Sequence, residues 1–237
     1  MGKIGIVCAS DTELAPFLPH LENTSVTEIA MLKFYEGTLG KVPVVAVYSG
    51  VCKVNAAIAA QILIDRFPIL GIINAGTAGG LEESIQLFDT VVSEMSAYHD
   101  VADDILTEFH PWLQSVFFPS NETLLAIARQ YSARSQYPIR FGRTGTGEQF
   151  VTDHKREEIK QRFSPLSTDM ETASIAHVCY VNRVPFLAIR TITDTAEHKG
   201  MDHFAKNCTM ASEISAHIVM ALIQELRGTN GTVVFTL

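Results

Sequence analysis

Two carboxylates separated by a single residue, Asp169 and Glu171, are candidate chemical groups in this sequence. They stand where an irregular polar stretch, residues 164–168, gives way to the apolar spacing of a helix, so a helix is expected to begin here. Thr168 and Glu171 have the spacing of a capping box. In the simplest interpretation, Glu171 closes that box and Asp169 favours the positive end of the helix dipole.

Two further carboxylates follow predicted strands. The apolar run 186–192 ends in Thr193 and Asp194, and the run 3–9 is followed by Glu13 at a strand-to-helix junction. Ligands of open α/β sheets bind beside the carboxyl ends of the strands, which is where Asp194 is expected. Glu13 taken alone is better explained as an acid in the first turn of a helix. The position of Asp194 therefore favours a functional interpretation of the whole region.

The elements that would position these groups alternate between strand and helix. Short apolar, β-branched runs predict strands at 3–9, 42–48, 70–74, 88–93, 139–144 and 186–192. Helical spacing and caps predict helices that begin near residues 14, 53, 121, 154, 169 and 201. Such alternation is typical of parallel βαβ units. The expected fold is an α/β, single-domain, three-layer α/β/α structure with a mostly parallel, doubly wound central sheet.

One domain is expected to span residues 1–237, with a loosely attached tail at 229–237. A chain of 237 residues suits one large domain, although length alone allows two. No linker, repeat or low-complexity segment interrupts the alternation. Residues 101–120 are irregular yet rich in apolar side chains, so this loop is expected to cover a partner subunit or a ligand.

The composition argues against several kinds of partner and cofactor. The formal net charge is -8 and no basic run occurs, which disfavours nucleic-acid and anionic-membrane partners. Four widely spread cysteines and an N-terminal apolar run too short for a secretory signal indicate the reducing cytoplasm. His198 and His203 have no neighbouring ligands for a metal. The glycines of 75–80 lack dinucleotide spacing and a Walker-type lysine, so no metal and no cofactor are expected.

Several short segments, in order over nearly the whole chain, carry a family resemblance. They are KIGI at 3–6 with Glu13, SGV at 49–51, KVNAA at 53–57, the glycines of 76–80, YHD at 98–100, META at 170–173, IAHVC at 175–179 and Asp194. Each motif taken alone is weak evidence for a family. Jointly they resemble the 5′-methylthioadenosine/S-adenosylhomocysteine nucleosidase family of the nucleoside phosphorylase superfamily. That family uses water to cleave the N-glycosidic bond of adenosine derivatives modified at C5′.

The resemblance implies a role for each of three carboxyl groups. Asp194 would protonate or hydrogen-bond N7 of adenine, Glu13 would orient and activate the water, and Glu171 would hold the ribose hydroxyls. These roles suit the chemistry, because cleavage builds positive charge on the ribose and negative charge on the purine. An acid on the purine side and a carboxylate on the water side are what an inverting displacement needs.

The resemblance also implies a set of residues around a small nucleoside substrate, in a homodimer. Phe150 would stack on the purine, Val151 would bond its edge through the backbone, and Thr193 would support Asp194. The remaining implied contacts are Met170, Val51, Thr77 and Ser10 around the ribose, and Phe204 in the pocket wall.

Several positions depart from the family pattern. Ser10 stands where the family commonly has Met, Thr77 where it has Ser, and Cys52 where it has Gly. Residues 101–120 replace a glycine-rich loop that helps to enclose the 5′-substituent across the dimer interface. The natural 5′-substituent is therefore open.

Two alternative functions stay open. A phosphate-dependent nucleoside phosphorylase should supply arginines for the phosphate, whereas the segments 49–57 and 76–80 offer only Lys53. A catalytically silent binder of adenosine derivatives would not need the carboxylates, but it would explain altered residues such as Ser10.

Overall fold

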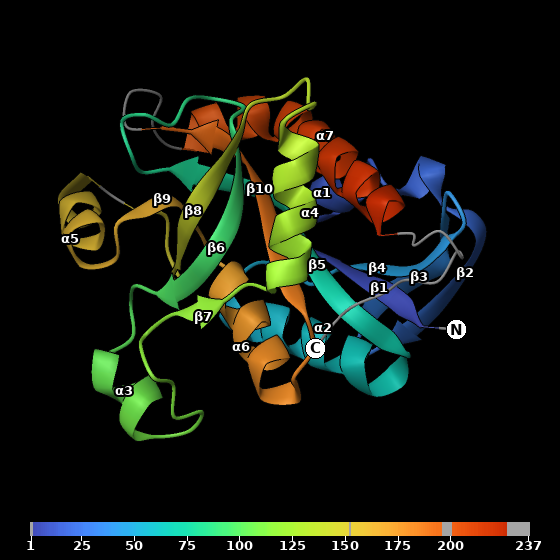
Figure 1. Ribbon diagram of the computed structural model, residues 1–237, viewed down its shortest axis with the longest axis horizontal. Coiled ribbons are helices and arrows are strands. Elements are labelled where there is room, and N and C mark those ends of the chain that lie inside the picture. Colours follow the sequence, from blue (N-terminus) through green and yellow to red (C-terminus); the bar gives the residue numbers. More distant parts are fainter. Residues whose placement is uncertain (1, 152, 196–200, 227–237) are drawn as a thin grey trace.

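The computed structural model describes residues 2–151, 153–195 and 201–226 (Figure 1). The strands are β1 (Lys3–Cys8), β2 (Glu22–Ile29), β3 (Leu32–Leu39), β4 (Val42–Tyr48), β5 (Ile69–Gly80), β6 (Thr90–Tyr98), β7 (Phe118–Pro119), β8 (Ile139–Thr146), β9 (Pro165–Asp169) and β10 (Phe186–Asp194). The helices are α1 (Asp11–Leu14), α2 (Lys53–Arg66), α3 (Asp103–Glu108), α4 (Glu122–Ser132), α5 (Asp153–Phe163), α6 (Thr172–Asn182) and α7 (Met201–Glu225), with a 3₁₀ turn at Leu18–His20.

The strands form one 10-stranded sheet. β4, β1, β5 and β10 are neighbours and run parallel, and β6, β8 and β9 form a second parallel group. Antiparallel pairings of β10 with β6 and of β5 with β9 join the two groups. As a result β5, β10, β6, β8 and β9 form a closed ring, which places Thr168 of β9 opposite Gly79 of β5.

The expected α/β class is confirmed, and the sheet is mixed. Among the described residues, five strand pairings are parallel and five are antiparallel. Three consecutive strands, β2, β3 and β4, pair antiparallel through short hairpins, whereas β1, β4 and β5 are parallel because longer connections separate them.

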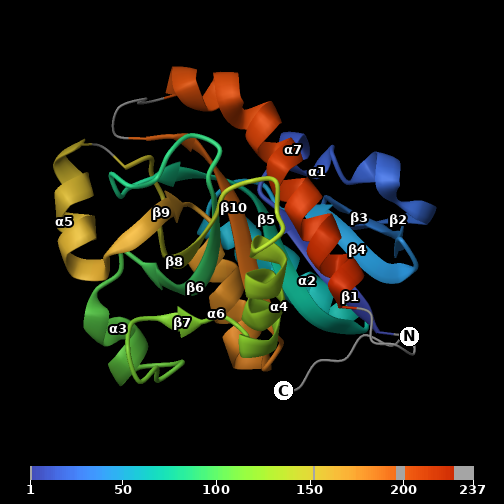
Figure 2. The same cartoon turned by 45° about the horizontal axis from the view of Figure 1, so that its top comes forward.

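Helices cover both faces of the sheet, as Figures 1 and 2 show. Alternate residues of β1 point to opposite faces: Ile6 joins a core with side chains of α1, α4 and α7, and Val7 joins a core with side chains of α2 and α6. Val44 and Val45 of β4 divide in the same way. The three-layer arrangement therefore follows from strands that are apolar on both sides. Within the described residues, no helix is both long and apolar enough to cross a bilayer.

Three segments differ from the sequence-based expectations. Residues 22–39 form the β2–β3 hairpin, whose outer strand buries almost nothing and so carries no apolar signal. The polar stretch 164–168 is not irregular, because 165–169 form β9 in the ring. The hydroxyl of Ser167 is satisfied inside the sheet, since its Oγ lies 3.2 Å from Thr144 Oγ1. Residues 101–120 contain α3 and β7. The tail at 229–237 and His198 lie outside the described residues.

The cap of α4 yields a test of local stability. Asn121 was expected to begin this helix, and its side chain accepts a hydrogen bond from the Leu124 amide at 3.1 Å. Asn121→Ala should lower the free energy of unfolding by about 0.5–2 kcal/mol, because one helix N–H loses its acceptor. Denaturant unfolding at one protein concentration measures the loss. Asn121→Asp keeps an acceptor and should stay close to the wild type; equal losses in both variants would show that the cap contributes nothing.

Candidate active site

A cavity of about 230 Å³ lies at the C-terminal ends of β1, β5, β9 and β10. This is the edge at which α/β sheets place their ligands. All the site residues expected from the sequence line it: Ser10, Glu13, Val51, Thr77, Phe150, Val151, Met170, Glu171, Thr193, Asp194 and Phe204. The structure thus brings together residues from seven separate stretches of the chain; their individual roles stay predictions.

Glu13 is anchored to the sheet. Ser10 caps the short helix α1, and Glu13 lies in its first turn, as the simplest interpretation expected. Its buried carboxylate accepts hydrogen bonds from the Ala9 amide at 2.7 Å and from the amide and hydroxyl of Thr77, both at 2.8 Å. The carboxylate is therefore held in the cavity wall by β1 and β5. It does more than complement the dipole of α1.

Gly76 makes room for this carboxylate. Its φ is +151°, and a Cβ there would lie 2.5 Å from the carboxyl atoms of Glu13. A side chain at this position would both strain the backbone and displace Glu13. The close approach that Gly76 permits therefore serves Glu13.

Glu171 lies at the N-cap position of α6, but the expected capping box is absent. Its side chain makes no cap hydrogen bond. It turns into the cavity instead, where it accepts from the Cys52 amide at 3.0 Å and from Arg190 Nη2 at 2.8 Å. Asp169 caps the helix in its place, accepting from the amides of Glu171 and Thr172 at 3.2 and 3.0 Å. The box prediction was wrong because Thr168 belongs to β9.

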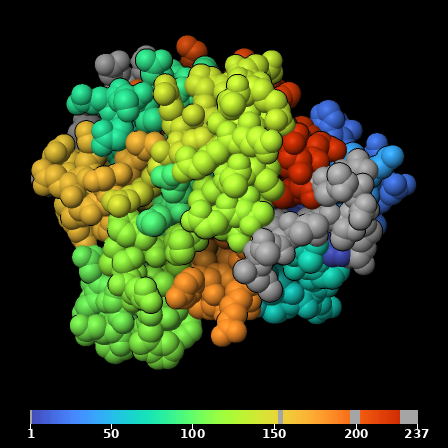
Figure 3. Space-filling view, in the orientation of Figure 1, coloured from blue at the N-terminus to red at the C-terminus, as the bar shows by residue number. Residues whose placement is uncertain are grey.

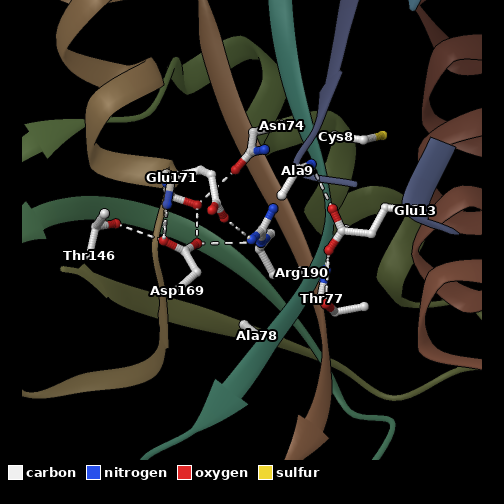
Figure 4. A network of polar contacts seen from close by, with 12 residues as sticks. Cys8, Ala9, Glu13, Asn74, Thr77, Ala78, Thr146, Asp169, Glu171 and Arg190 are labelled. Atoms are coloured by element: carbon white, nitrogen blue, oxygen red, sulfur yellow. Dashed lines mark hydrogen bonds and ion pairs between the residues drawn. The ribbon is translucent and has the colours of Figure 1, made fainter. Parts of the chain in front are cut away.

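Arg190 connects the carboxylates. This arginine of β10 is 1% exposed; its Nε lies 3.3 Å from Asp169 Oδ2 at an ion-pair distance, without hydrogen-bond alignment. Figure 4 shows its guanidinium between Asp169 and Glu171 on one side and Glu13 on the other. Burial alone would lower the pKa of Arg190, but the three carboxylates raise it. Within the described part of the chain its Nη1 is buried and has no hydrogen-bond partner.

Burial also perturbs Glu171. It raises the pKa of this carboxyl group to about 7; Arg190 opposes the rise, and the negative charges of Asp169 and Glu13 add to it. Glu171 therefore changes its charge near neutral pH. At that pH the group formed by Asp169, Glu13 and Glu171 carries either two or three negative charges around the guanidinium of Arg190.

Asp194 ends β10 beside Gly79. Burial raises the pKa of Asp194, and a 2.8 Å hydrogen bond from Thr193, together with the positive charges of Arg156 and His203, opposes the rise. A carboxyl group with a raised pKa retains its proton at a higher pH than an ordinary aspartate. Asp194 is thus suited to act as an acid.

Aromatic side chains stand beside Asp194 in the cavity lining. The rings of Phe150 and Phe204 meet edge to face with their centroids 5.7 Å apart, and Phe150 is 44% exposed. A flat heterocycle would gain contact with both rings. Val151 adjoins them in the lining.

Two arginines that line the cavity, Arg190 and Arg156, were not predicted from the sequence to be site residues. Arg190 could have been recognised as a charge in the middle of the apolar run 186–192, since a buried charge requires partners. Arg156 of α5 gave no such signal, because its helix is highly charged. Its Nη1 donates to the carbonyls of Gly80 and Leu81 at 2.8 and 3.3 Å, which fixes α5 beside the end of β5.

Lys53 lies outside this cavity. Its ammonium group is 2.9 Å from Asp100, and Asp100 also accepts from the Glu148 amide at 2.9 Å. Asp100 therefore makes structural contacts and does not orient His99. In the described residues, no group of three or more His, Cys, Asp or Glu side chains is arranged to hold a metal ion.

The chain matches known proteins over nearly its full length. The sequence model of the phosphorylase superfamily matches residues 3–224. A 5′-methylthioadenosine/S-adenosylhomocysteine nucleosidase of Halalkalibacterium halodurans is 35% identical over 95% of this chain and 100% of that protein. The corresponding nucleosidase of Tolumonas auensis is 32% identical over 94% of this chain and 100% of its own.

A solved structure of a nucleosidase is also similar to this protein. The nucleosidase of S. pneumoniae, bound to the transition-state inhibitor MT-ImmA, superposes with a TM-score of 0.86. It is 32% identical, and the match covers 94% of this chain and 99% of that one. With the sequence matches, this similarity extends over the sheet, the helices and the cavity-lining segments alike. The chain belongs to the 5′-methylthioadenosine/S-adenosylhomocysteine nucleosidase family, within the phosphorylase superfamily.

Proposed function

We propose that this protein hydrolyses the N-glycosidic bond of 5′-substituted adenosines, such as 5′-methylthioadenosine or S-adenosylhomocysteine, to adenine and a ribose derivative. One observation carries the proposal: the carboxyl groups of Asp194, Glu13 and Glu171 line a single cavity of nucleoside size. The nucleosidases to which the chain is similar are named for this reaction.

Asp194 acts at the purine. Its raised pKa supports protonation of N7, which draws off the negative charge that develops as the C1′–N9 bond breaks. Thr193 orients the carboxyl group with a 2.8 Å hydrogen bond. Phe150 and Phe204 hold the ring, and Val151 bonds its edge through the backbone.

Glu13 and Glu171 act at the sugar. The carboxylate of Glu13, fixed by the amides of Ala9 and Thr77, orients a water molecule and accepts its proton as the water attacks C1′. Glu171 binds the ribose hydroxyls beside Met170. The negative charge of both groups stabilises the positive charge that develops on the ribose.

Phosphorolysis is the second candidate, because the superfamily contains phosphorylases and Arg190 supplies the arginine that the sequence analysis did not find. However, the guanidinium is already held by Asp169 and Glu171. With Glu13 also in the wall, the surroundings of the sugar carry a net negative charge in either protonation state of Glu171. A phosphate anion would be repelled, whereas a neutral water molecule would not. A silent binder is disfavoured because each carboxyl group has a defined place.

We also propose a homodimer. Apolar side chains of α2, α6 and residues 105–112 are exposed, and the green, orange and teal atoms of these three segments adjoin along the lower part of the view in Figure 3. Their exposed fractions are Val54 69%, Ile58 44%, Ile105 45%, Phe109 60%, Trp112 65%, Tyr180 42% and Val181 41%. We name these seven residues the apolar patch. The ring of His110 lies 6.4 Å from that of His177, which joins the loop to α6.

The apolar patch adjoins the cavity. Val51, 48% exposed, lines the cavity and lies two residues before the start of α2, which carries Val54. A second subunit seated on the patch would therefore complete the wall around the 5′-end of the substrate. Leu113 and Phe118, expected to contact a partner or ligand, are buried within their own chain, and Phe117 packs on Phe163 with a centroid distance of 6.3 Å. Phe109 and Trp112 are the aromatic side chains of this loop that remain exposed for contacts with a partner subunit.

We propose a cytoplasmic location. All four cysteines, Cys8, Cys52, Cys179 and Cys208, are free thiols. Free, mostly buried thiols are usual in proteins of reducing compartments.

The first prediction concerns the nucleophile. Adenine and a free ribose derivative should form from 5′-methylthioadenosine in phosphate-free buffer, because the site presents carboxylates to the nucleophile. Chromatography of the products measures the reaction. Release that requires phosphate and yields a ribose 1-phosphate would establish the phosphorylase alternative, and binding without turnover would establish the silent binder.

The second prediction concerns the acid and the base. Asp194→Asn and Glu13→Gln should each lower kcat by ~10²–10⁴-fold while the fold and much of the nucleoside binding remain, since an amide cannot transfer the proton. Steady-state kinetics and calorimetry separate rate from binding. Asp11→Asn, an exposed change on the same short helix as Glu13, is the matched control. Near-normal turnover in either test variant would refute its assignment.

Glu171 has a distinct expected phenotype. Glu171→Gln should weaken ribose binding as well as rate and should discriminate less sharply against 2′-deoxy substrates, because an amide offers one acceptor oxygen in place of two. Kinetics on ribose and 2′-deoxyribose substrates test this. If Glu171 serves only the fold, the variant will lose stability and keep its kinetic constants.

The last prediction of this set concerns assembly. Replacing Phe109 and Trp112 together with Ser should dissociate the dimer and change the preference between methylthio and bulkier 5′-substituents, because both side chains lose buried apolar area, worth roughly 1.5–3 kcal/mol each. Sedimentation and kinetics report the two effects. Val26→Ser with Met31→Ser, exposed by 53% and 94% on the β2–β3 hairpin, is the control. A dimeric patch variant with an unchanged substrate profile would exclude both roles.

A further inference from the structure

Asp169, the last residue of β9, uses one oxygen to fix the start of α6. Its Oδ1 accepts hydrogen bonds from Thr146 Oγ1 at 2.7 Å, from the Thr172 amide at 3.0 Å and from the Glu171 amide at 3.2 Å. The backbone from which the Glu171 side chain departs is thus tied to β8 and β9. No comparable hold on this turn comes from the side chain of Glu171 itself.

The other oxygen of Asp169 holds Arg190. Oδ2 accepts from the hydroxyl of Thr172 and lies 3.3 Å from Arg190 Nε. The far end of the same guanidinium donates to Glu171 Oε2 at 2.8 Å. Asp169 therefore reaches Glu171 by two routes, through the backbone of the turn and through Arg190, as Figure 4 shows.

Charge is the second link between these groups. Arg190 from β10, Asp169 from β9, Glu13 from α1 and the amide of Cys52 are the groups that face Glu171. Asp169 and Glu13 disfavour the ionised form of Glu171, and Arg190 and the amide favour it. Of the two neighbouring carboxylates, Glu13 belongs to the proposed chemistry, whereas Asp169 has no assigned part in it.

We propose that Asp169 is a positioning residue for the ribose end of the site: it fixes the turn from which Glu171 departs and holds the arginine that binds Glu171, with its negative charge close to that carboxyl group. The inference rests on the proposed function, because that proposal gives Glu171 its contact with the ribose hydroxyls. An ionised Glu171 accepts hydrogen bonds from both hydroxyls and attracts the positive charge of the reacting sugar, whereas a protonated one does so less well.

The charge of Asp169 determines the direction in which this residue shifts the pKa of Glu171. Because the negative charge of Asp169 raises the pKa of Glu171, an uncharged residue at 169 should lower that pKa. Arg190, released from Asp169, would act on Glu171 alone and shift it in the same direction. Ligand binding that needs ionised Glu171 should then persist to lower pH.

Calorimetric binding of 5′-methylthio-7-deazaadenosine between pH 5 and pH 9 tests the inference. This probe lacks N7, so Asp194 has no ring nitrogen at that position to protonate. In the wild type the affinity should fall as the pH decreases through about 7, the pKa of Glu171. In Asp169→Asn the midpoint should lie lower by about one pH unit or more, a tenfold change in the ionisation constant per unit.

Three comparison variants separate charge from structure. Thr146→Val removes a hydrogen bond from Asp169 without changing its charge, so it should lower affinity or stability and leave the midpoint in place. Asp169→Glu keeps the charge but displaces it; it should keep the midpoint and weaken binding. Glu171→Gln should abolish the midpoint.

An unchanged midpoint in a folded Asp169→Asn protein would overturn the inference. If that variant does not fold, unimpaired binding by Asp169→Glu, or a midpoint that survives in Glu171→Gln, would overturn it equally. Failure of the proposed function looks different: the wild type would then release no adenine without phosphate, whether or not it binds the probe. A wild type that does both, with a midpoint insensitive to residue 169, refutes the role of Asp169 alone.

Discussion

A guanidinium in the interior of a sheet has to be neutralised, and that requirement links the chemical groups of this protein. Arg190 is 1% exposed, and an unpaired charge at such a depth would strongly destabilise the fold. Asp169 and Glu171 supply the countercharge, and each is fixed in turn by backbone amides. Glu13 lies on the far side of the same guanidinium (Figure 4). Each of these charged groups interacts with more than one other, so the site is stabilised as one network and not as separate pairs.

The closed ring of strands determines which parts of the chain meet in that network. β5 and β10 run parallel to β1, so Glu13, Thr77 and Asp194 arrive at one edge of the sheet, although 181 positions separate Glu13 from Asp194 in the sequence. The antiparallel pairing of β9 with β5 brings Asp169 and the start of α6 to the same edge. An open parallel sheet would have provided the first set but not the second. The mixed topology is therefore a requirement of the site.

The α/β class and the carboxyl groups could be predicted because they follow from local patterns. Apolar runs on both sides of a strand indicate helices on both faces, and a carboxylate at a strand end is visible without knowledge of its neighbours. The polar strand β9 and the position of Asp169 could not be predicted. The partners that make burial of these polar side chains favourable lie elsewhere in the chain; Thr146, which donates a hydrogen bond to Asp169, is 23 positions away. The β2–β3 hairpin buries little and leaves no apolar period to recognise. Residues whose energetics depend on distant partners are therefore the ones that sequence reasoning missed.

The charge of the network also decides between the two nucleophiles available to this superfamily. A phosphate nucleophile is negatively charged. Its binding would need positively charged side chains that are not already paired with carboxylates. Arg190 is not such a side chain, because Asp169 and Glu171 already engage it. Water brings no charge, and a neighbouring carboxylate, in the proposed reaction Glu13, makes it a better nucleophile by accepting its proton. The excess of carboxylates also favours a positively charged sugar in the transition state. The carboxylates that neutralise the buried guanidinium of Arg190 thus favour hydrolysis over phosphorolysis.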